Sequence, residues 1–351
     1  MKLKSALYIC STYHHVFVTL SKCLIEKQDV DVILCDDIPK YAELQHSLYK
    51  SKIFRHVYLF NNSRCPGYNP EGLFKRCFGR HAHHRKIIER ELKIDFTRYD
   101  RIYIFHDGTK LGRYLMDTRT KYHLIEDGLD FYKVIDTTPS SFMLEKFSGF
   151  RFFLKKFLNI GYIFCGQNRF CQSIEVNDSK DIQIPSKKIH TLPKKILYQT
   201  LLPSQKNMIY KIFVSSSVEF DTFEKKILIL TIPLFIDKYV KTEENQKEIY
   251  SKLIDEYKGN GNRIYLKPHP RDKTDYSKME GVVVLDRFVP TEAYNFHPNL
   301  FFEKAVAIHS SSIDVIENVC KKEKLPIGYL NRYRNYLNDW VINIIDSGSN
   351  E

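Results

Sequence analysis

Short runs of apolar residues alternate with longer stretches in which apolar positions recur at helical spacing. Strand-length apolar runs occupy residues 3–10, 30–35, 57–60 and 101–105, and a helical pattern covers residues 13–26. Buried strands that alternate with helices are typical of a parallel sheet covered on both faces. The pattern therefore predicts an α/β domain in the first half of the chain.

The pattern weakens over residues 173–206, which contain three prolines, and then restarts. We interpret this stretch as a connection between domains. Beyond it the pattern predicts strands at 226–236, 263–266, 282–285 and 305–309, a helix at 244–257 and a helix that begins at Ile313. We predict a domain at 1–190 and a second at 191–351, whose last helix packs back on the first domain.

Composition excludes several classes of protein. The chain carries 54 Lys and Arg against 42 Asp and Glu, a net charge of +12, which favours an anionic partner. No apolar stretch is long enough for a membrane-spanning helix, and the first residues do not form a signal peptide. The 8 cysteines include no C-x-x-C pair, so we expect free thiols in a cytoplasmic protein.

Two adjacent carboxylates, Glu126 and Asp127, follow a short apolar run and precede Gly128. At the carboxyl end of a strand, partial burial and a neighbouring like charge would both raise the pKa of Asp127 and make it a usable general base. The alternative is an ordinary turn, because Asp-Gly is a common turn dipeptide.

A rigid basic loop follows the strand predicted at 263–266. In the run 267–271, His269 lies between Pro268 and Pro270, whose rings restrict the backbone, and Lys267 and Arg271 flank it. This group could hold a phosphate, to which His269 could donate a proton. The alternative is a strand exit with basic residues that face solvent.

Two further motifs lie downstream. Ser310 and Ser311 precede the helix predicted from Ile313, so their hydroxyls and the free backbone N–H groups could bind an anion. Simple N-capping is the alternative. Glu292, after Pro290, could bind ribose hydroxyls, or could lie in the first turn of a helix.

In this order, the acidic pair with its glycine, the His-Pro pair, the Pro-x-Glu motif and the Ser-Ser pair resemble the motifs of bacterial sialyltransferases, especially glycosyltransferase family 52. That family includes lipooligosaccharide and capsule sialyltransferases. The run 267–271 is the most specific part of the resemblance, which extends across most of the chain.

The resemblance implies a GT-B fold, in which two Rossmann-like domains have parallel sheets that face a cleft. The first domain would bind the acceptor and the second CMP-sialic acid, and the transfer would be inverting and independent of metal. The implied roles are base for Asp127, acid and phosphate ligand for His269, acceptor-side contacts for Glu126 and Gly128, ribose ligand for Glu292, phosphate ligands for Ser310 and Ser311, and nucleotide-site residues for Lys267, Pro270 and Arg271. Asp237 is the reserve candidate for the base.

The chemistry agrees with these expectations. The leaving group is a monophosphate, so protonation by His269 and fixed hydrogen-bond donors could neutralise its charge without a metal or other cofactor. No D-x-D motif stands at a strand end, and we interpret Asp36-Asp37 as a strand exit. The expected substrates are a nucleotide-sugar donor and a terminal sugar hydroxyl, with galactose as the expected acceptor, on a bacterial surface glycan that a lipid could carry.

Aromatic and basic residues interleave over 147–158, a combination that suits an anionic membrane surface. It predicts a peripheral contact with the inner face of the cell membrane, while a helix packed on the core or on a second subunit of a homodimer is the alternative. Two other functions stay open. One is another envelope-polymer transferase, either a CDP-glycerol-type glycerophosphotransferase or an enzyme that uses a different nucleotide sugar, and the other is a basic nucleic-acid-binding protein. No nucleic-acid-binding motif is present, so nucleic acid is not an expected partner.

Overall fold

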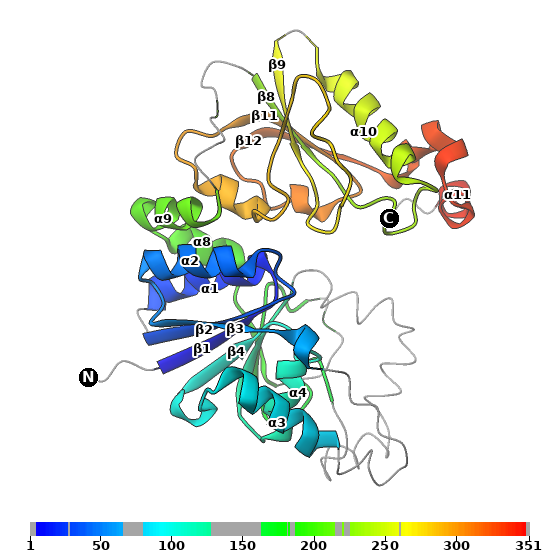
Figure 1. Ribbon diagram of the computed structural model, residues 1–351. Coiled ribbons are helices and arrows are strands. Elements are labelled where there is room, and N and C mark those ends of the chain that lie inside the picture. Colours follow the sequence, from blue (N-terminus) through cyan, green and yellow to red (C-terminus); the bar gives the residue numbers. More distant parts are fainter. Residues whose placement is uncertain are drawn as a thin grey trace. The chain divides into compact units, whose positions relative to one another are not determined.

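A computed structural model describes residues 5–26, 29–65, 80–127, 163–180, 182, 187–214, 220, 225–259 and 261–348. The chain divides into two compact units, Met1–Leu202 and Pro203–Glu351. Each unit contains one parallel sheet with helices beside it (Figure 1). The described residues contain no helix long and apolar enough to cross a membrane.

Among the described residues, the sheet of the first unit has seven strands in the order β3-β2-β1-β4-β5-β6-β7, and every pairing between them is parallel. Its strands are β1 (Ser5–Cys10), β2 (Asp29–Cys35), β3 (His56–Phe60), β4 (Arg101–Ile104), β5 (Tyr122–Ile125), β6 (Cys171–Val176) and β7 (Ile189–Thr191). The strand order reverses at β1, as in doubly wound α/β domains.

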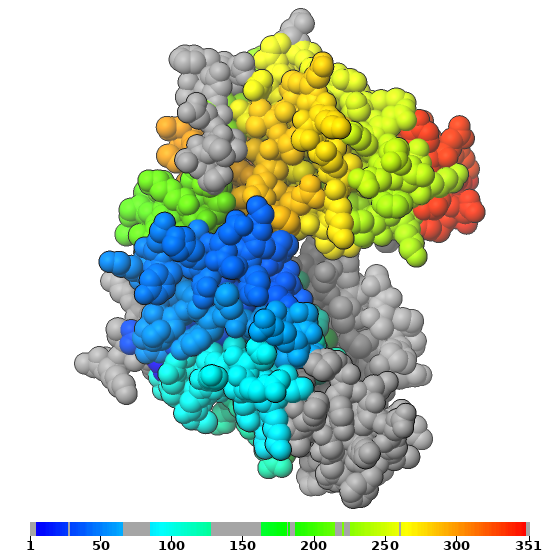
Figure 2. Space-filling view, in the orientation of Figure 1, coloured from blue at the N-terminus to red at the C-terminus, as the bar shows by residue number. Residues whose placement is uncertain are grey.

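Helices cover both faces of this sheet. They are α1 (Tyr13–Glu26), α2 (Tyr41–Ser51), α3 (Arg80–Leu92), α4 (Lys110–Asp117) and α8 (Lys194–Thr200). Figure 1 shows α1 and α2 on one face and α3 and α4 on the other, and in the space-filling view residues of α2 and α3, in blue and cyan, form part of the surface (Figure 2). The middle of α1 is buried from His15 to Cys23, because it lies against the sheet.

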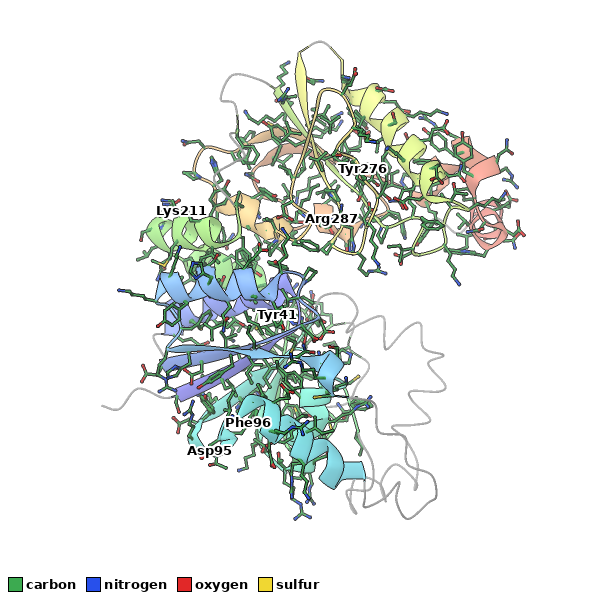
Figure 3. All side chains as sticks on the ribbon, in the orientation of Figure 1. Tyr41, Asp95, Phe96, Lys211, Tyr276 and Arg287 are labelled. Atoms are coloured by element: carbon green, nitrogen blue, oxygen red, sulfur yellow. The ribbon has the colours of Figure 1, made fainter. Side chains whose placement is uncertain are left out.

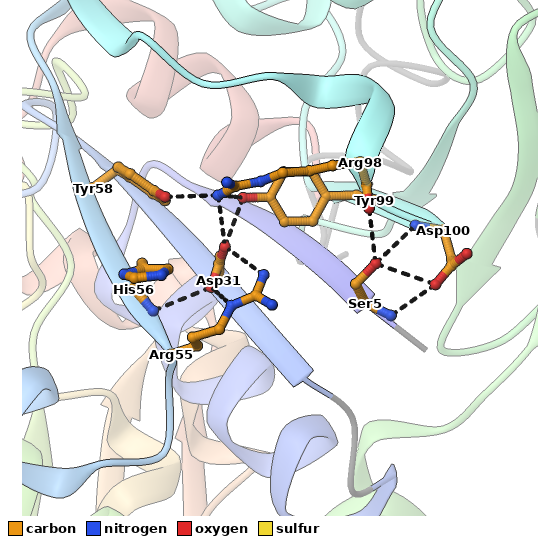
Figure 4. Close-up of polar contacts among 8 residues, drawn as sticks. All are labelled: Ser5, Asp31, Arg55, His56, Tyr58, Arg98, Tyr99 and Asp100. Atoms are coloured by element: carbon orange, nitrogen blue, oxygen red, sulfur yellow. Dashed lines mark hydrogen bonds and ion pairs between the residues drawn. The ribbon is translucent and has the colours of Figure 1, made fainter. Parts of the chain in front are cut away.

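A buried carboxylate joins the amino-terminal ends of three strands of the first unit (Figure 4). Asp31 in β2 has no exposed surface and accepts hydrogen bonds from Arg55 Nε at 3.0 Å and Nη2 at 2.9 Å. It also accepts from His56 N at 3.1 Å, Arg98 Nη2 at 3.2 Å and Tyr99 Oη at 2.6 Å. One carboxylate thus satisfies five donors from the segments that lead into β3 and β4.

In the described part of the second unit, a five-stranded sheet has the order β10-β9-β8-β11-β12, again with only parallel pairings. Its strands are β8 (Lys225–Leu230), β9 (Asn262–Lys267), β10 (Val282–Val284), β11 (Phe302–Ile308) and β12 (Val319–Leu325). Its helices are α9 (Pro203–Phe213), α10 (Glu243–Tyr257), α11 (Asp339–Asp346) and the 3-10 segments η4 (Thr291–Phe296), η5 (Ser311–Ile313) and η6 (Ile327–Tyr336). The two sheets confirm the predicted α/β class, with the two Rossmann-like domains expected of the GT-B type.

The division between the units differs from the predicted boundary at 190/191. That boundary would split β7, which pairs with β6, and the first unit continues to Leu202. The stretch that we interpreted as a connection contains most of β6, all of β7 and α8, and the start of α9. These strands were missed because they are short and, in β6, buried residues alternate with exposed or half-buried ones.

The end of the second unit also differs from expectation. Instead of a helix from Ile313, the single 3-10 turn η5 is followed by β12. The residues Lys321, Lys322 and Lys324 of β12 are exposed, so the strand has no apolar run that could predict it. The last helix, α11, packs Val341 into the core of its own unit.

Candidate active site

In the first unit, Asp127 follows β5 and lies beside His15 in the first turn of α1. His15 Nε2 is 2.7 Å from Asp127 Oδ1, and the side chains are 2% and 34% exposed. Because the helix begins where β1 ends, both groups lie at the carboxyl edge of the sheet, where α/β domains bind ligands. Part of the Asp127 carboxylate therefore remains accessible.

The tautomer of His15 follows from its second ring nitrogen. The Ser11 N–H donates to His15 Nδ1 at 3.0 Å, so Nδ1 is an acceptor and Nε2 carries the proton that is donated to Asp127. The imidazole stacks on Phe105, with the ring centres 4.1 Å apart. Burial lowers the pKa of His15, so it is a neutral donor at neutral pH.

These surroundings correct the expectation that the pKa of Asp127 is raised. Burial does oppose ionisation of Asp127, but its electrostatic and hydrogen-bond interactions with His15, together with those with His14 and Lys194, outweigh burial and lower the pKa to about 2. The expected increase in pKa rested on partial burial and on the neighbouring carboxylate, Glu126, whereas these groups lie far from Asp127 in the sequence. Asp127 is thus an ionised carboxylate at neutral pH and a weaker base than predicted.

The neighbouring Glu126 is turned into the fold. It is 3% exposed, and its carboxylate accepts a hydrogen bond from the backbone N–H of Asn177, which follows β6. Lys194 Nζ donates to the Glu126 carbonyl at 3.1 Å and lies 3.5 Å from His14 Nε2. Glu126 therefore holds the ends of β5 and β6 together, while Gly128 and the stretch 147–158 lie outside the described residues.

In the second unit, Lys267 is the last residue of β9 and is 3% exposed. Its Nζ donates to the carbonyl oxygens of Pro268 and Arg287, both at 3.0 Å. Burial, with a smaller effect of the Arg287 charge, lowers its pKa to about 7, although Asp286 and Glu292 act in the opposite direction. In this conformation Lys267 orders the loop backbone.

His269 is fixed through both its backbone and its ring. Its N–H donates to Thr231 Oγ1 at 3.1 Å, and its carbonyl accepts from the Asp272 N–H at 2.8 Å. The Arg271 N–H donates to His269 Nδ1 at 3.1 Å, so the ring proton of the neutral form is on Nε2. Burial lowers the pKa of His269 to about 4, and the charges of Arg271 and Lys267 add to this effect.

Two predicted site residues, Arg271 and Asp237, bind each other. The guanidinium donates from Nη1 to Oδ1 at 2.6 Å and from Nη2 to Oδ2 at 3.0 Å. The side chains are 59% and 29% exposed, and exposed ion pairs contribute little stability, roughly 0–1 kcal/mol. An anionic ligand could therefore replace Asp237 as the partner of Arg271. Pro270, between His269 and Arg271, is exposed.

The serines lie at the carboxyl end of β11, but they do not begin an α-helix. Ser310 is buried, and its Oγ accepts from the Ser312 N–H at 3.3 Å, while Ser311 begins η5. Glu292 lies in η4, and its charge acts on Lys267. The motifs from β9, η4 and β11 thus belong to one unit with a shared sheet.

Three residues of these surroundings were missed: His15, Thr231 and Asp272. Their partners lie 112, 38 and 41 positions away in the sequence. His15 lies in the first turn of the helix that follows the first strand, so its place at a carboxyl edge was the one available signal. Within the described ranges, no group of three or more His, Cys, Asp or Glu residues could hold a metal ion.

Two surface grooves of the second unit do not include the predicted residues. One, of about 580 Å³, lies between α9 and residues 295–301 and has Phe296 and Asn318 in its lining. The other, of about 510 Å³, lies beside α10 and includes Lys278. The hydrogen bonds and charges at the strand ends, and not these grooves, therefore define the candidate site.

An uncharacterised protein of Haemophilus influenzae (strain ATCC 51907 / DSM 11121 / KW20 / Rd) is 34% identical over 86 residues, which are 24% of this chain and 27% of that relative. Thus the match spans about a quarter of the relative's length.

Two solved structures are similar to this chain in fold. LpCGTa in complex with UDP has a TM-score of 0.44 and 11% identity, with 87% of this chain and 75% of that chain covered. MurG of Acinetobacter baumannii has a TM-score of 0.36 and 10% identity, with 97% and 93% covered.

The family comparison covers the centre of the candidate site. The model of glycosyltransferase family 52 matches residues 73–301, a range that includes Asp127, Asp237, His269 and Glu292. Ser310 and Ser311 follow this range. Because the match covers more than half of the chain, the protein belongs to glycosyltransferase family 52 and is a glycosyltransferase.

Proposed function

We propose that the protein transfers sialic acid from CMP-sialic acid to a terminal sugar hydroxyl, with galactose as the expected acceptor, on a bacterial surface glycan. The reaction is inverting and needs no metal. The membership of family 52 supports the reaction class, and the geometry of His269 is the observation that carries the choice of a monophosphate leaving group. The protein would act in the cytoplasm, at the inner face of the membrane.

His269 is suited to a phosphate because of its fixed tautomer. With Nδ1 occupied by the Arg271 N–H, the proton on Nε2 is the one available to a ligand. In the free protein the low pKa makes His269 a neutral hydrogen-bond donor. A bound anionic donor would stabilise the imidazolium, which could then protonate the departing phosphate.

The transfer is a single displacement. The acceptor oxygen forms a bond to the anomeric carbon of sialic acid while the bond from that carbon to the phosphate oxygen breaks, and the electron pair leaves with CMP. A carboxylate takes the proton of the hydroxyl, and His269 supplies a proton to the phosphate. Asp127 is the proposed base, because its carboxylate is ionised and partly exposed at a strand end.

Asp237 remains the alternative base, since it belongs to the same unit as His269. In the free protein Arg271 occupies both of its oxygens, so Asp237 could act only after that pair opens. Ser310 and Ser311 are proposed to hold the phosphate and Glu292 the ribose. Lys267 would shape the nucleotide site through the backbone rather than by direct contact.

Thermal-shift measurements with CMP, CDP, UDP and GDP, each with and without EDTA, test the donor class. A nucleotide that binds only the folded protein raises its unfolding temperature, so CMP should stabilise the wild type selectively and fail to stabilise His269→Ala. A preference for UDP or GDP would move the protein to another donor class. Stabilisation by CDP would favour the glycerophosphotransferase, and no response would direct attention to oligonucleotides.

Transfer assays with CMP-sialic acid decide between the two bases. Asp127→Ala should abolish transfer and leave CMP affinity nearly unchanged, because Asp127 lies in the unit proposed to bind the acceptor. The matched variant is Asp237→Ala. If Asp127→Ala remains active while Asp237→Ala is inactive, Asp237 is the base.

A further inference from the structure

We propose that Thr231 is a positioning residue that holds His269 in its working orientation, and that the buried carboxylate of Asp272 orients Thr231 for this task. The inference rests on the proposed function, in which His269 interacts with the departing phosphate. It concerns residues to which neither the motifs nor the family comparison gives a role.

Thr231 follows β8 directly and is 2% exposed. Its N–H donates to the Lys267 carbonyl at 3.1 Å, and its Oγ1 accepts the His269 N–H at 3.1 Å. One residue therefore binds both ends of the Lys-Pro-His segment and extends the pairing of β8 with β9 into the loop. Because Pro268 lacks an N–H, the hydrogen bond to Thr231 Oγ1 is the first one beyond β9 that the loop backbone can donate.

Asp272 orients the Thr231 hydroxyl so that its oxygen is available to the His269 N–H. Thr231 Oγ1 donates its single proton to Asp272 Oδ2 at 2.7 Å. The hydroxyl oxygen can then only accept from the loop, and it faces the His269 N–H. The Asp272 N–H in turn donates to the His269 carbonyl at 2.8 Å, so the two residues hold His269 from both sides.

The Asp272 carboxylate is itself fixed by other donors. It is 1% exposed and accepts from Gln246 Nε2 at 2.7 Å, the Thr274 N–H at 3.0 Å and Tyr276 Oη at 2.9 Å. Gln246 lies in α10, and its Oε1 accepts the Phe235 N–H at 2.7 Å. This hydrogen bond fixes the turn that contains Asp237. A fully satisfied buried network of this kind fixes one geometry.

Figure 3 shows Tyr276 inside the second unit beside α10, and Arg287 nearer to the strand ends. Arg287 Nη1 donates to the carbonyl of Asp272. The Tyr276 hydroxyl donates to Asp272 Oδ2 at 2.9 Å and accepts from Gln246 Nε2 at 2.8 Å, so its hydrogen bonds are made within the network and not to the His269 loop. Tyr276 thus provides a matched control that weakens the network but keeps the Thr231 contact.

Small movements of the imidazole should be measurable, because charged groups surround it. Arg271 and Lys267 disfavour its protonation, whereas Asp237 and Asp272 favour it, and burial has the largest effect. If the loop loosens, the ring gains solvent and its pKa should rise from about 4 toward the ordinary 6.5. The pKa of His269 therefore reports its position even without turnover.

The experiment compares Thr231→Val, Thr231→Ser and Tyr276→Phe in the full-length protein. Valine keeps the shape of threonine but removes the hydroxyl, serine keeps the hydroxyl, and phenylalanine removes one hydrogen bond to Asp272. Three readouts are taken: the midpoint of thermal unfolding, kcat and KM for CMP-sialic acid, and an NMR titration of the His269 ring. The His269→Gln variant assigns the His269 signal.

We expect Thr231→Val to lower kcat by about 10–100-fold, as misplaced catalytic groups do, and to raise the pKa of His269. Thr231→Ser should restore both, and Tyr276→Phe should lower the unfolding midpoint without moving the pKa. An unchanged pKa in Thr231→Val, or equal changes in Thr231→Val and Tyr276→Phe, would overturn the inference. If the wild type transfers no sialic acid, the proposed function fails, while the titration still decides whether Thr231 positions His269.

Discussion

Replacement of Asp31 by alanine should destabilise the first unit strongly and leave its chemistry intact. The substitution removes the acceptor of five hydrogen bonds at the amino-terminal ends of β2, β3 and β4. The candidate base Asp127 follows β5 at the opposite, carboxyl edge of the same sheet. The change therefore separates the stability of the fold from the geometry of the site.

The loss of stability in Asp31→Ala depends on whether the donors that lose their acceptor can reach water. Arg55 and Arg98 are 41% and 45% exposed and can turn to water, whereas Tyr99 is buried and loses the acceptor of its hydroxyl. Breaking a buried ion pair on one side typically costs about 3–5 kcal/mol, and solvation of the two arginines places Asp31→Ala near the lower end. A loss of about 3 kcal/mol corresponds to a decrease of about 6–12 °C in Tm for a unit of this size.

The dependence on pH provides a second test of the same carboxylate. Burial alone would raise the pKa of Asp31, but the hydrogen bonds from Arg55 and Tyr99 outweigh it and lower the pKa. Its contribution is therefore complete above the unfolded-state pKa of about 3.9 and is lost as the pH falls through the folded-state pKa. The difference between wild type and Asp31→Ala should shrink in acid.

Scanning calorimetry at neutral pH, which can resolve the two units, measures the loss directly. Asp100→Ala is the matched control, because Asp100 is exposed and accepts hydrogen bonds from Ser5 alone among the residues drawn in Figure 4. We expect this control to lose no more than about 1 kcal/mol. Equal Tm values for Asp31→Ala and Asp100→Ala would refute the reasoning, as would a lower kcat of folded Asp31→Ala.

Three further predictions concern the candidate site. Arg271→Lys should raise the KM for the donor about tenfold in initial-rate measurements, since one ammonium cannot replace a bidentate guanidinium, and an unchanged KM would remove Arg271 from the nucleotide site. Because the pKa of His269 falls to about 4 from 6.5, its neutral form contributes stability that is complete above pH 6.5 and is lost toward pH 4. Urea unfolding should show a loss of up to about 3 kcal/mol over that window in the wild type and a flatter profile in His269→Gln. EDTA should leave the initial rate unaltered, whereas inactivation that Mg²⁺ reverses would contradict the proposed departure of the phosphate.

The local pattern of apolar and polar residues was sufficient to predict much of the fold. The helical spacing at residues 13–26 matches α1 at both ends. The apolar runs predicted most of the strands of the two sheets, namely β1, β2, β3, β4, β8, β9, β10 and β11. The strands β6 and β12 were not predicted. In β6 buried side chains alternate with more exposed ones, and in β12 most side chains are charged. A strand at the edge of a sheet, or a strand with one solvent-exposed face, does not need the continuous apolar run that a central parallel strand has.

The candidate site was predicted residue by residue but not in its contacts. The His-Pro loop and the acidic pair were recognisable as short motifs, yet the partners that set their protonation were not. His15 lies 112 positions from Asp127, and Asp237 lies 34 positions from Arg271. Such pairs depend on which strand ends meet at one edge of a sheet, and this follows from strand order rather than from local spacing.

The lysines of β12 have a consequence for the protein at high concentration. A parallel sheet that ends in an open strand offers unpaired backbone groups to a second copy of the chain. Here one edge strand, β10, has only 3 residues, and the other, β12, presents the exposed Lys321, Lys322 and Lys324. Pairing of β12 strands from two molecules would bring these like charges together. The second unit therefore resists edge-to-edge polymerisation, because β10 is too short to pair stably at one edge and the lysines of β12 repel each other at the other edge.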